Sequence, residues 1–431
     1  MKRELGKFEL ANALSGEYAP FNAVSVLSLT NGPNPETLQK AFHVLQQRHF
    51  LLRVQILKSK NHYNYESEGT PQIPLRIVYR EKDNHWISLA EQELNRGFDL
   101  VPGPLVRCTY LVSSGQDSDC EILLTFHHSI VDAASAIHFL HNLLSLSADF
   151  EMGNSIDDLS PLPLLLPEEN YFPPTFKGLS RRWKTFQFAF RQIGDEIKYR
   201  HQSRGQKKAA VQEKARCRIL TVEMPAETTE KIIRNSRSKK VTLNSILSAA
   251  MLMAVARNLY GDQDIPLRHI SFPDLRPYLK PPISEENMGV FHSMIRSTIF
   301  MRSGQDFWEL AHQINKKIYK ASKRGDKFIA PLMSPQMMSM FIRSQKMRMA
   351  TTALSYPGIA KIGLSYGNIQ VKKIHGFVSN FPIGPEYTAT ARIFNRKLWW
   401  DILYLDTDMD QNKAAKIADE IRSILQSAGQ S

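Results

Sequence analysis

Cysteine and long apolar runs are both scarce in this sequence of 431 residues. The three cysteines, Cys108, Cys120 and Cys217, form no C-x-x-C pair, which excludes a disulfide framework and a zinc ribbon. The longest apolar run, from Ile246 to Ala256, is interrupted by Ser248 and is too short to cross a bilayer. The first seven residues are charged and lack the apolar core of a signal peptide. We therefore expect a soluble, cytoplasmic protein.

What is present is typical of a globular chain. Apolar residues make up 42% of the sequence and aromatic residues 10%, which excludes general disorder. The length exceeds what one core usually supports, so two domains or two halves of one architecture are expected.

The net charge of +13 is unevenly distributed along the chain. Residues 1–170 carry 13 basic and 21 acidic side chains, a net charge of −8. Residues 171–218 carry 13 basic and 3 acidic side chains, a net charge of +10, and residues 219–431 carry 29 and 18, a net charge of +11. No nucleic-acid-binding motif accompanies this charge, so we expect no nucleic acid partner. Anionic lipid, acidic carrier proteins and phosphate-bearing cofactors all fit the basic part of the chain.

Strand and helix patterns follow one another along both halves of the chain. In the front half, strands are expected at 22–30, 51–56, 105–112 and 122–126, and helices at 34–48, 86–96 and from about Asp132. In the back half, strands are expected at 218–222, 270–272, 294–301 and 398–405, and helices at 242–260, 306–320 and 412–425. The sequence therefore predicts a mixed α/β (α+β) fold with two halves of similar size.

A proline-rich stretch at 147–175 separates the halves. We predict an N-terminal half at 1–165, a linker with a basic amphipathic helix at 166–214, and a C-terminal half at 215–431. In the linker helix, apolar residues recur at helical spacing: Leu179, Trp183, Phe186, Phe190, Ile193 and Ile197. This stripe either packs on the protein with its charges solvated, or meets an anionic membrane or lipid.

The sharpest local feature is a pair of histidines after an apolar strand: His127 and His128, followed by Asp132 at a helix start. Side chains of consecutive strand residues point to opposite faces, so the two imidazoles are poorly placed to share one metal ion. One of them can face a cavity, where neutral imidazole near pH 7 is suited to act as a general base. Paired histidines also occur as hydrogen-bonded core or surface residues, and composition alone does not separate these interpretations.

This His-His-x-x-x-Asp segment resembles the active-site motif of the chloramphenicol-acetyltransferase-like acyltransferases. That superfamily includes condensation domains of non-ribosomal peptide synthetases and freestanding polyketide-associated acyltransferases that esterify phthiocerol-type lipids. Further segments resemble the family in the same order: Arg48-His49-Phe50-Leu51-Leu52-Arg53, Pro104-Leu105-Val106-Arg107, Asp274-Leu275-Arg276-Pro277 with the later Gly289, and Leu354-Ser355-Tyr356-Pro357-Gly358. The resemblance therefore covers most of the chain.

The resemblance implies a fold and a set of residue roles. Two chloramphenicol-acetyltransferase-like halves are expected to form a V with a channel along their interface. His128 is expected to be catalytic and His127 supporting, while Asp132 is structural and pairs with Arg276. No metal and no bound cofactor are implied beyond the thioester co-substrate, and no cofactor-binding residues are identified. Ala133 stands where the family usually has glycine.

The implied reaction is direct acyl transfer from a thioester to a hydroxyl or amine of a lipid, polyketide or peptide acceptor. The donor is either acyl-CoA or an acyl chain on the phosphopantetheine arm of a carrier protein acting in trans. The rival hypothesis is a catalytically silent condensation-like module that recruits partner proteins. Ala133 and the departures at Tyr356 and Pro357 motivate this rival.

A second motif, Gly363-Leu364-Ser365-Tyr366-Gly367, matches the G-x-S-x-G nucleophile elbow of α/β-hydrolases. That motif requires a helix directly after the serine. The next residues, 368–374, alternate like a strand instead, so we interpret the match as a coincidence.

Overall fold

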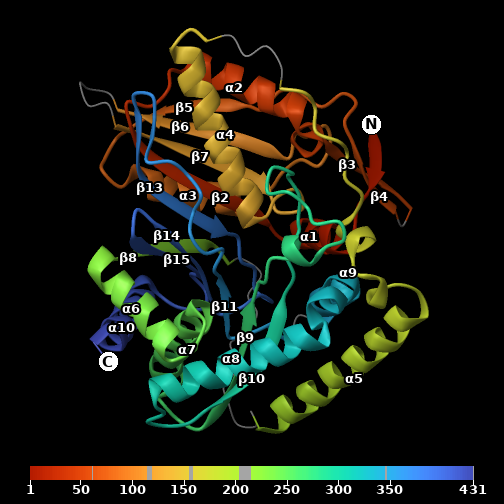
Figure 1. The fold of residues 1–431 in the computed structure, drawn as a ribbon, viewed down its shortest axis with the longest axis vertical. Coiled ribbons are helices and arrows are strands. Elements are labelled where there is room, and N and C mark those ends of the chain that lie inside the picture. The colour runs from red at the N-terminus through yellow and green to blue at the C-terminus, as the bar shows by residue number, and fades with distance from the viewer. Residues whose placement is uncertain (61, 114–118, 155–158, 203–214, 345–346, 431) are drawn as a thin grey trace. The chain divides into compact units, whose positions relative to one another are not determined.

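The computed structural model describes residues 1–60, 62–113, 119–154, 159–202, 215–344 and 347–430 (Figure 1). These residues form two compact units. Unit 1 consists of Met1–Tyr171, Leu279–Phe291 and Ile359–Ser379, and unit 2 of Phe172–Tyr278, His292–Gly358 and Asn380–Ser431. Both units combine helices with sheets, which confirms the mixed α/β class. The V-shaped arrangement and its channel stay predictions.

Unit 1 contains a six-stranded sheet in the order β12-β13-β2-β7-β6-β5. Its strands are β2 (Asn22–Thr30), β5 (Leu75–Tyr79), β6 (Val106–Val112), β7 (Asp119–His127), β12 (Ser365–Tyr366) and β13 (Ile369–Val378). β13 pairs antiparallel with β2 and so carries residues 359–379 into unit 1. The contiguous halves expected from the sequence therefore differ from the compact units, because each unit is assembled from three stretches of chain. A smaller sheet joins β1 (Lys2–Glu4), β4 (His62–Glu66) and β3 (Gln55–Ser59).

The helices of unit 1 are α1 (Lys7–Tyr18), α2 (Pro35–Arg48), α3 (His85–Asn95) and α4 (Ala133–Glu151), with short 3-10 turns at Phe50–Arg53 and Glu168–Tyr171. α4 lies across the six-stranded sheet with α2 beside it (Figure 1). Phe139 of α4 stacks on Phe42 of α2 at 6.3 Å between ring centroids and meets Phe126 of β7 edge-on at 5.6 Å. These rings join the helical layer to the sheet.

One expected strand of unit 1 is wrong in its first half. Residues 51–56 were expected to be extended, but Phe50–Arg53 form a 3-10 turn and β3 begins only at Gln55. The turn is closed by the Leu52 N–H, which donates to the His49 carbonyl at 3.2 Å. A short apolar run does not distinguish such a buried turn from a strand.

Unit 2 contains a second six-stranded sheet in the order β10-β9-β11-β14-β15-β8. Its strands are β8 (Cys217–Met224), β9 (Ile265–Ser271), β10 (Ile295–Met301), β11 (Thr352–Ser355), β14 (Tyr387–Phe394) and β15 (Lys397–Leu405). Its helices are α5 (Gly178–Gln202), α6 (Ala226–Ser238), α7 (Leu243–Tyr260), α8 (Phe307–Arg324), α9 (Asp326–Ser344) and α10 (Gln411–Gln430), with 3-10 turns at Pro174–Phe176 and Arg276–Tyr278.

The longest apolar run of the sequence lies in α7, the core helix of unit 2. Every residue from Ser245 to Ala256 is buried there. By length and hydropathy, none of the described helices could cross a bilayer alone, while α6 and α7 taken together pass that test with a bend of 109° between them.

Three of the buried histidines have an imidazole pKa far below its ordinary value. His49 and His127 lie in unit 1 and His269 lies in β9 of unit 2. Burial lowers the pKa of each imidazole to about 3, because the charged form would lose its hydration. The folded chain therefore binds these protons less readily than the unfolded chain, whose histidines titrate near pH 6.5.

We predict that the free energy of unfolding falls as the pH decreases from about 6.5 toward 3. Each of these three histidines contributes a slope of up to about 1.4 kcal/mol per pH unit, since only the unfolded chain binds its proton in this range. Urea unfolding between about pH 7 and pH 5.5 measures the slope before most carboxylates titrate. His269→Gln should make the free energy of unfolding depend less steeply on pH. His62→Gln changes an exposed histidine and should leave this dependence as it is. An unchanged slope in His269→Gln would contradict the assignment.

Candidate active site

The histidine pair lies at the end of β7. Phe126 packs on α4, so the next side chain, His127, points to the other face of the sheet. There it is buried and meets the ring of Phe98 at 6.1 Å between centroids. His128 follows the strand, and its backbone N–H donates to the Phe21 carbonyl at 3.0 Å. The two imidazoles therefore have different surroundings.

His128 is held in one tautomer by its neighbour in the turn. Its Nδ1 lies 2.9 Å from the carbonyl oxygen of Val131. A carbonyl oxygen only accepts hydrogen bonds, so Nδ1 carries the proton and the basic lone pair lies on Nε2. Burial lowers the pKa of His128, which keeps the imidazole neutral at pH 7. A half-buried, neutral imidazole with a fixed tautomer is suited to accept a proton at Nε2.

His127 is packed against backbone and hydroxyl groups. Its Nδ1 accepts from the Ser129 N–H at 3.2 Å and lies 2.7 Å from the Ser129 hydroxyl. Its Nε2 faces Gly16 of α1 so closely that a Cβ atom at Gly16 would overlap it. These contacts indicate a structural position for His127, between the sheet and α1.

Asp132 is the N-cap of α4 and also binds a distant stretch of unit 1. One carboxylate oxygen accepts from the Ser135 N–H at 2.9 Å, and the other accepts from the Phe291 N–H at 2.8 Å. The Ser135 hydroxyl donates to the Gly289 carbonyl at 3.1 Å and accepts from the Gly289 N–H at 3.2 Å. Asp132 and Ser135 thus attach residues 289–291 to the start of α4. Ala133 is the first helical residue, with no left-handed backbone that would require glycine.

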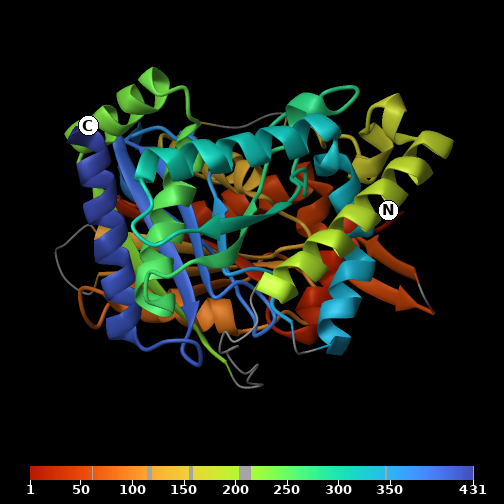
Figure 2. The same cartoon turned by 90° about the horizontal axis from the view of Figure 1, so that it is seen from below.

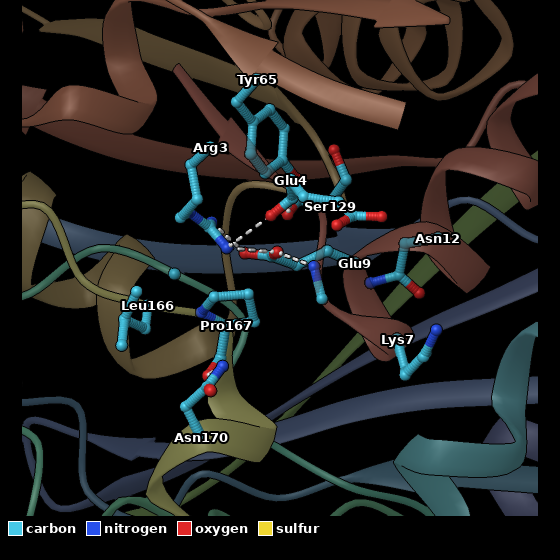
Figure 3. A network of polar contacts seen from close by, with 12 residues as sticks. Arg3, Glu4, Lys7, Glu9, Asn12, Tyr65, Ser129, Leu166, Pro167 and Asn170 are labelled. Atoms are coloured by element: carbon cyan, nitrogen blue, oxygen red, sulfur yellow. Dashed lines mark hydrogen bonds and ion pairs between the residues drawn. The ribbon is translucent and has the colours of Figure 1, made fainter. Parts of the chain in front are cut away.

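A polar network that includes Asn12 and Tyr65 lies next to Ser129, the residue after His128 (Figure 3). The Asn12 side chain donates to the His128 carbonyl at 3.0 Å, and the Tyr65 hydroxyl donates to the Ser129 carbonyl at 2.7 Å. Burial raises the pKa of Tyr65 well above its ordinary value, so this donor stays protonated. Asn12 and Tyr65 thus fix the carbonyls of two consecutive residues, His128 and Ser129.

An ion pair supports this network from α1. Arg3 and Glu9 are both buried and form two hydrogen bonds, of 2.9 and 2.7 Å. Glu9 also accepts from the Gly6 N–H at 2.7 Å, which caps α1, and the Arg3 guanidinium lies over the Tyr65 ring at 5.1 Å. Sequence reasoning missed these residues, because no motif marks them and their spacing carries no chemical signature.

A small cavity, partly open to solvent, adjoins this ion pair. Arg3, Glu9 and His49 contribute polar groups to its wall, and much of the rest is apolar: Phe50, Leu51, Leu162, Leu164, Leu165, Leu166 and Met288. Phe291 lies on the same wall and is also the residue that binds Asp132. The cavity therefore shares the 289–291 segment with the start of α4.

Arg276 and the 354–358 segment belong to unit 2. Arg276 is buried at the start of a 3-10 turn, with its guanidinium 3.5 Å from the Asp274 carboxylate. Tyr356 and Pro357 follow β11, and Gly358 has a φ of 90°, which favours glycine. The expected pair of Asp132 with Arg276 joins the two units and stays a prediction.

A serine nucleophile elbow and a metal site would each require a particular arrangement of residues. Ser365 lies in β12, and after the turn at Gly367 the chain enters β13 rather than a helix, so the G-x-S-x-G match is no nucleophile elbow. Among the residues that the structure describes, no three histidine, cysteine or acidic side chains are grouped to hold a metal ion.

Two family models match this chain. Residues 10–163 match the condensation domain, and residues 213–380 match the C-terminus of phthiocerol/phthiodiolone dimycocerosyl transferase. The chain belongs to the condensation-domain acyltransferase superfamily. Membership of this superfamily supports acyl transfer as the general class of reaction.

Proteins of known structure share the fold of this chain over almost its whole length. Polyketide synthase associated protein 5 from Mycobacterium tuberculosis has a TM-score of 0.72 at 15% identity, covering 99% of this chain and 98% of the other. The trichothecene 15-O-acetyltransferase TRI3 from Fusarium sporotrichioides has a TM-score of 0.77 at 14% identity, covering 99% and 95%. These likenesses establish the fold.

A curated relative gives a similar result at the sequence level. Phosphinothricin tripeptide synthetase PhsC from Streptomyces viridochromogenes is 23% identical over 253 residues, covering 56% of this chain. The match spans 21% of that protein, so only about one fifth of its length is covered.

We predict that Gly16→Ala destabilises unit 1. The regular helical backbone of α1 would itself favour alanine by about 1 kcal/mol, but the added Cβ overlaps His127, and overpacking costs about 1–3 kcal/mol. Gly194→Ala in α5 is the matched control, because nothing lies within 4 Å of its Cβ position. Denaturant unfolding should show a loss for the first variant and none for the second. If both variants gained the same free energy of unfolding, the close packing described for His127 would be contradicted.

Proposed function

We propose that this chain transfers an acyl group from a thioester to a hydroxyl or amine, with Nε2 of His128 as the general base. The observation that carries the proposal is the hydrogen bond from Nδ1 of His128 to the Val131 carbonyl, which puts the basic lone pair on Nε2. The lowered pKa of His128 supports it, because a base must be unprotonated at the working pH.

In the proposed reaction, the acceptor oxygen or nitrogen attacks the thioester carbonyl while its proton moves to Nε2 of His128. The tetrahedral intermediate then collapses, the carbon–sulfur bond breaks, and the imidazolium returns the proton to the leaving thiolate. The products are an ester or amide and a free thiol, so no oxidant or metal is required. Neither a serine nor a cysteine nucleophile takes part, so no acyl-enzyme forms.

The proposed donor is an acyl chain on a phosphopantetheinyl carrier protein in trans, with acyl-CoA as the alternative. The names of the relatives, a tripeptide synthetase and a polyketide synthase associated protein, support a carrier-borne donor.

We predict that His128→Ala lowers the rate of thioester consumption by about 10²–10⁴-fold, because general-base catalysis typically contributes that much. Thiol release from a panel of carrier-bound and CoA thioesters, with mass spectrometry of the products, measures the effect. His62→Ala is the matched control, since His62 is an exposed histidine of the same unit. Thermal unfolding must show that His128→Ala remains folded.

Two outcomes would change this proposal. Near-normal turnover in folded His128→Ala would exclude His128 as the base. If the unmodified protein consumes no thioester with any acceptor tested, the catalytically silent recruitment module becomes the better account.

We further propose that Asp132 pairs with Arg276 and so couples the start of α4 to unit 2. Removing either partner of a buried ion pair typically costs about 3–5 kcal/mol. We therefore predict that Asp132→Ala and Arg276→Ala each destabilise the protein, and that the double variant loses less than the sum of both. Denaturant unfolding of all four proteins measures the coupling, and additive losses would show that the two residues are not partners.

A further inference from the structure

The basic helix α5 turns its apolar side away from the protein. Six residues form this outward stripe and are between 54% and 80% exposed: Leu179, Trp183, Phe186, Phe190, Ile193 and Ile197. At about 100° per residue they lie within an arc of roughly 80°. Figure 2 shows α5 at the outside of unit 2, beside α9. The interpretation that the stripe packs on the protein is therefore wrong.

The opposite side of α5 is anchored to unit 2 by polar contacts. Phe188 is buried there. Among the side-chain contacts that join the helix to its neighbours are Arg191 to Asp326 at 2.7 Å, Glu196 to Arg268 at 2.6 Å, and Thr298 to Asp195 at 2.7 Å. Turning α5 by half a rotation to bury the stripe would break all three contacts. The outward orientation is thus fixed by the polar contacts of α5 with other elements of unit 2.

Aromatic rings dominate the first half of the stripe. The Trp183 ring stacks near Phe186 at 6.0 Å between centroids, and Phe186 lies 4.4 Å from Phe190. Tryptophan and phenylalanine on one side of a basic amphipathic helix are typical of helices that lie in the interface of a bilayer.

Cations flank the stripe. Arg182 and Lys198 are exposed, and neither forms an ion pair with any residue in the described part of the chain. The segment 171–218 carries 13 basic against 3 acidic residues, although residues 203–214 lie outside the described residues. The surface that α5 presents is therefore apolar along its middle and basic along its borders.

We propose that α5 binds to the surface of an anionic bilayer, with its stripe among the acyl chains and its flanking cations at the headgroups. A second copy of this chain is disfavoured as the occupant, because pairing two stripes would bring two segments of net charge +10 together. An acidic carrier protein would neutralise the cations without requiring six exposed apolar side chains. Only an anionic lipid surface fits both properties of the helix. This binding does not depend on the proposed acyl transfer.

The test is co-sedimentation of the full chain with phosphatidylcholine vesicles, with and without phosphatidylglycerol. We expect binding to the anionic vesicles at about 50 mM salt and a large loss at about 500 mM, because screening shortens the reach of the charges. Trp183→Ala/Phe186→Ala should lower the partition coefficient at least ten-fold. Tyr319→Ala is the matched control, an aromatic residue of unit 2 that is 65% exposed outside the stripe, and should bind as the unmodified protein does.

The cations are tested separately. Arg182→Gln/Lys198→Gln should lower the partition coefficient about five-fold per removed charge, which corresponds to about 1 kcal/mol each near an anionic surface. Lys413→Gln/Lys416→Gln removes the same charge from exposed positions of α10 and should have little effect. Equal losses in both pairs would show non-specific attraction and overturn the role of α5.

Two further outcomes would also overturn the proposal. One is the absence of binding to anionic vesicles at low salt. The other is a dimer, detected by light scattering without lipid, that Trp183→Ala/Phe186→Ala abolishes, since it would identify a second copy as the occupant. All variants change exposed side chains, and circular dichroism with thermal unfolding confirms that they fold. Quenching of Trp183 fluorescence by brominated lipid, absent in Trp183→Phe, would support insertion directly.

Discussion

The carboxylate of Asp132 joins three parts of unit 1 at one point. It ends the turn that follows β7, caps the first turn of α4 through the Ser135 N–H, and binds the Phe291 N–H from a segment more than 150 residues away. Each of its oxygens accepts a backbone donor that would otherwise be buried without a partner. The direction in which α4 leaves the sheet, and the position of the 289–291 segment on the cavity wall, both depend on this one side chain.

The turn that carries His128 is fixed from behind as well. Asn12 and Tyr65 bind consecutive carbonyls, and the buried pair of Arg3 and Glu9 lies next to Tyr65. Burying two charges is expensive in free energy, and their hydrogen bonds offset much of that cost. Such a network fixes the geometry of the turn. This matters for His128, because its proposed chemistry depends on where its Nε2 points.

Local signals predicted much of this fold. Alternation gave the bounds of β2, Asn34 and Pro35 marked the start of α2, and the motif placed Asp132 at the start of α4. Nothing local marked Asn12 or Tyr65, because their roles arise only when distant elements pack together. Amphipathic spacing predicted α5 and its stripe but not which side faces the protein. That choice depends on ion pairs with Arg268 and Asp326, partners that lie more than 70 residues away.

The pairing of β13 with β2 has a consequence for how the chain folds during synthesis. β2 lies between β13 and β7, and its six consecutive residues from Val24 to Leu29 are all buried. Until the ribosome has released residues 369–378, β2 is an unprotected edge rich in valine and leucine. Unit 1 therefore cannot be completed before most of the chain has emerged, and its first 171 residues alone would expose an edge prone to aggregation.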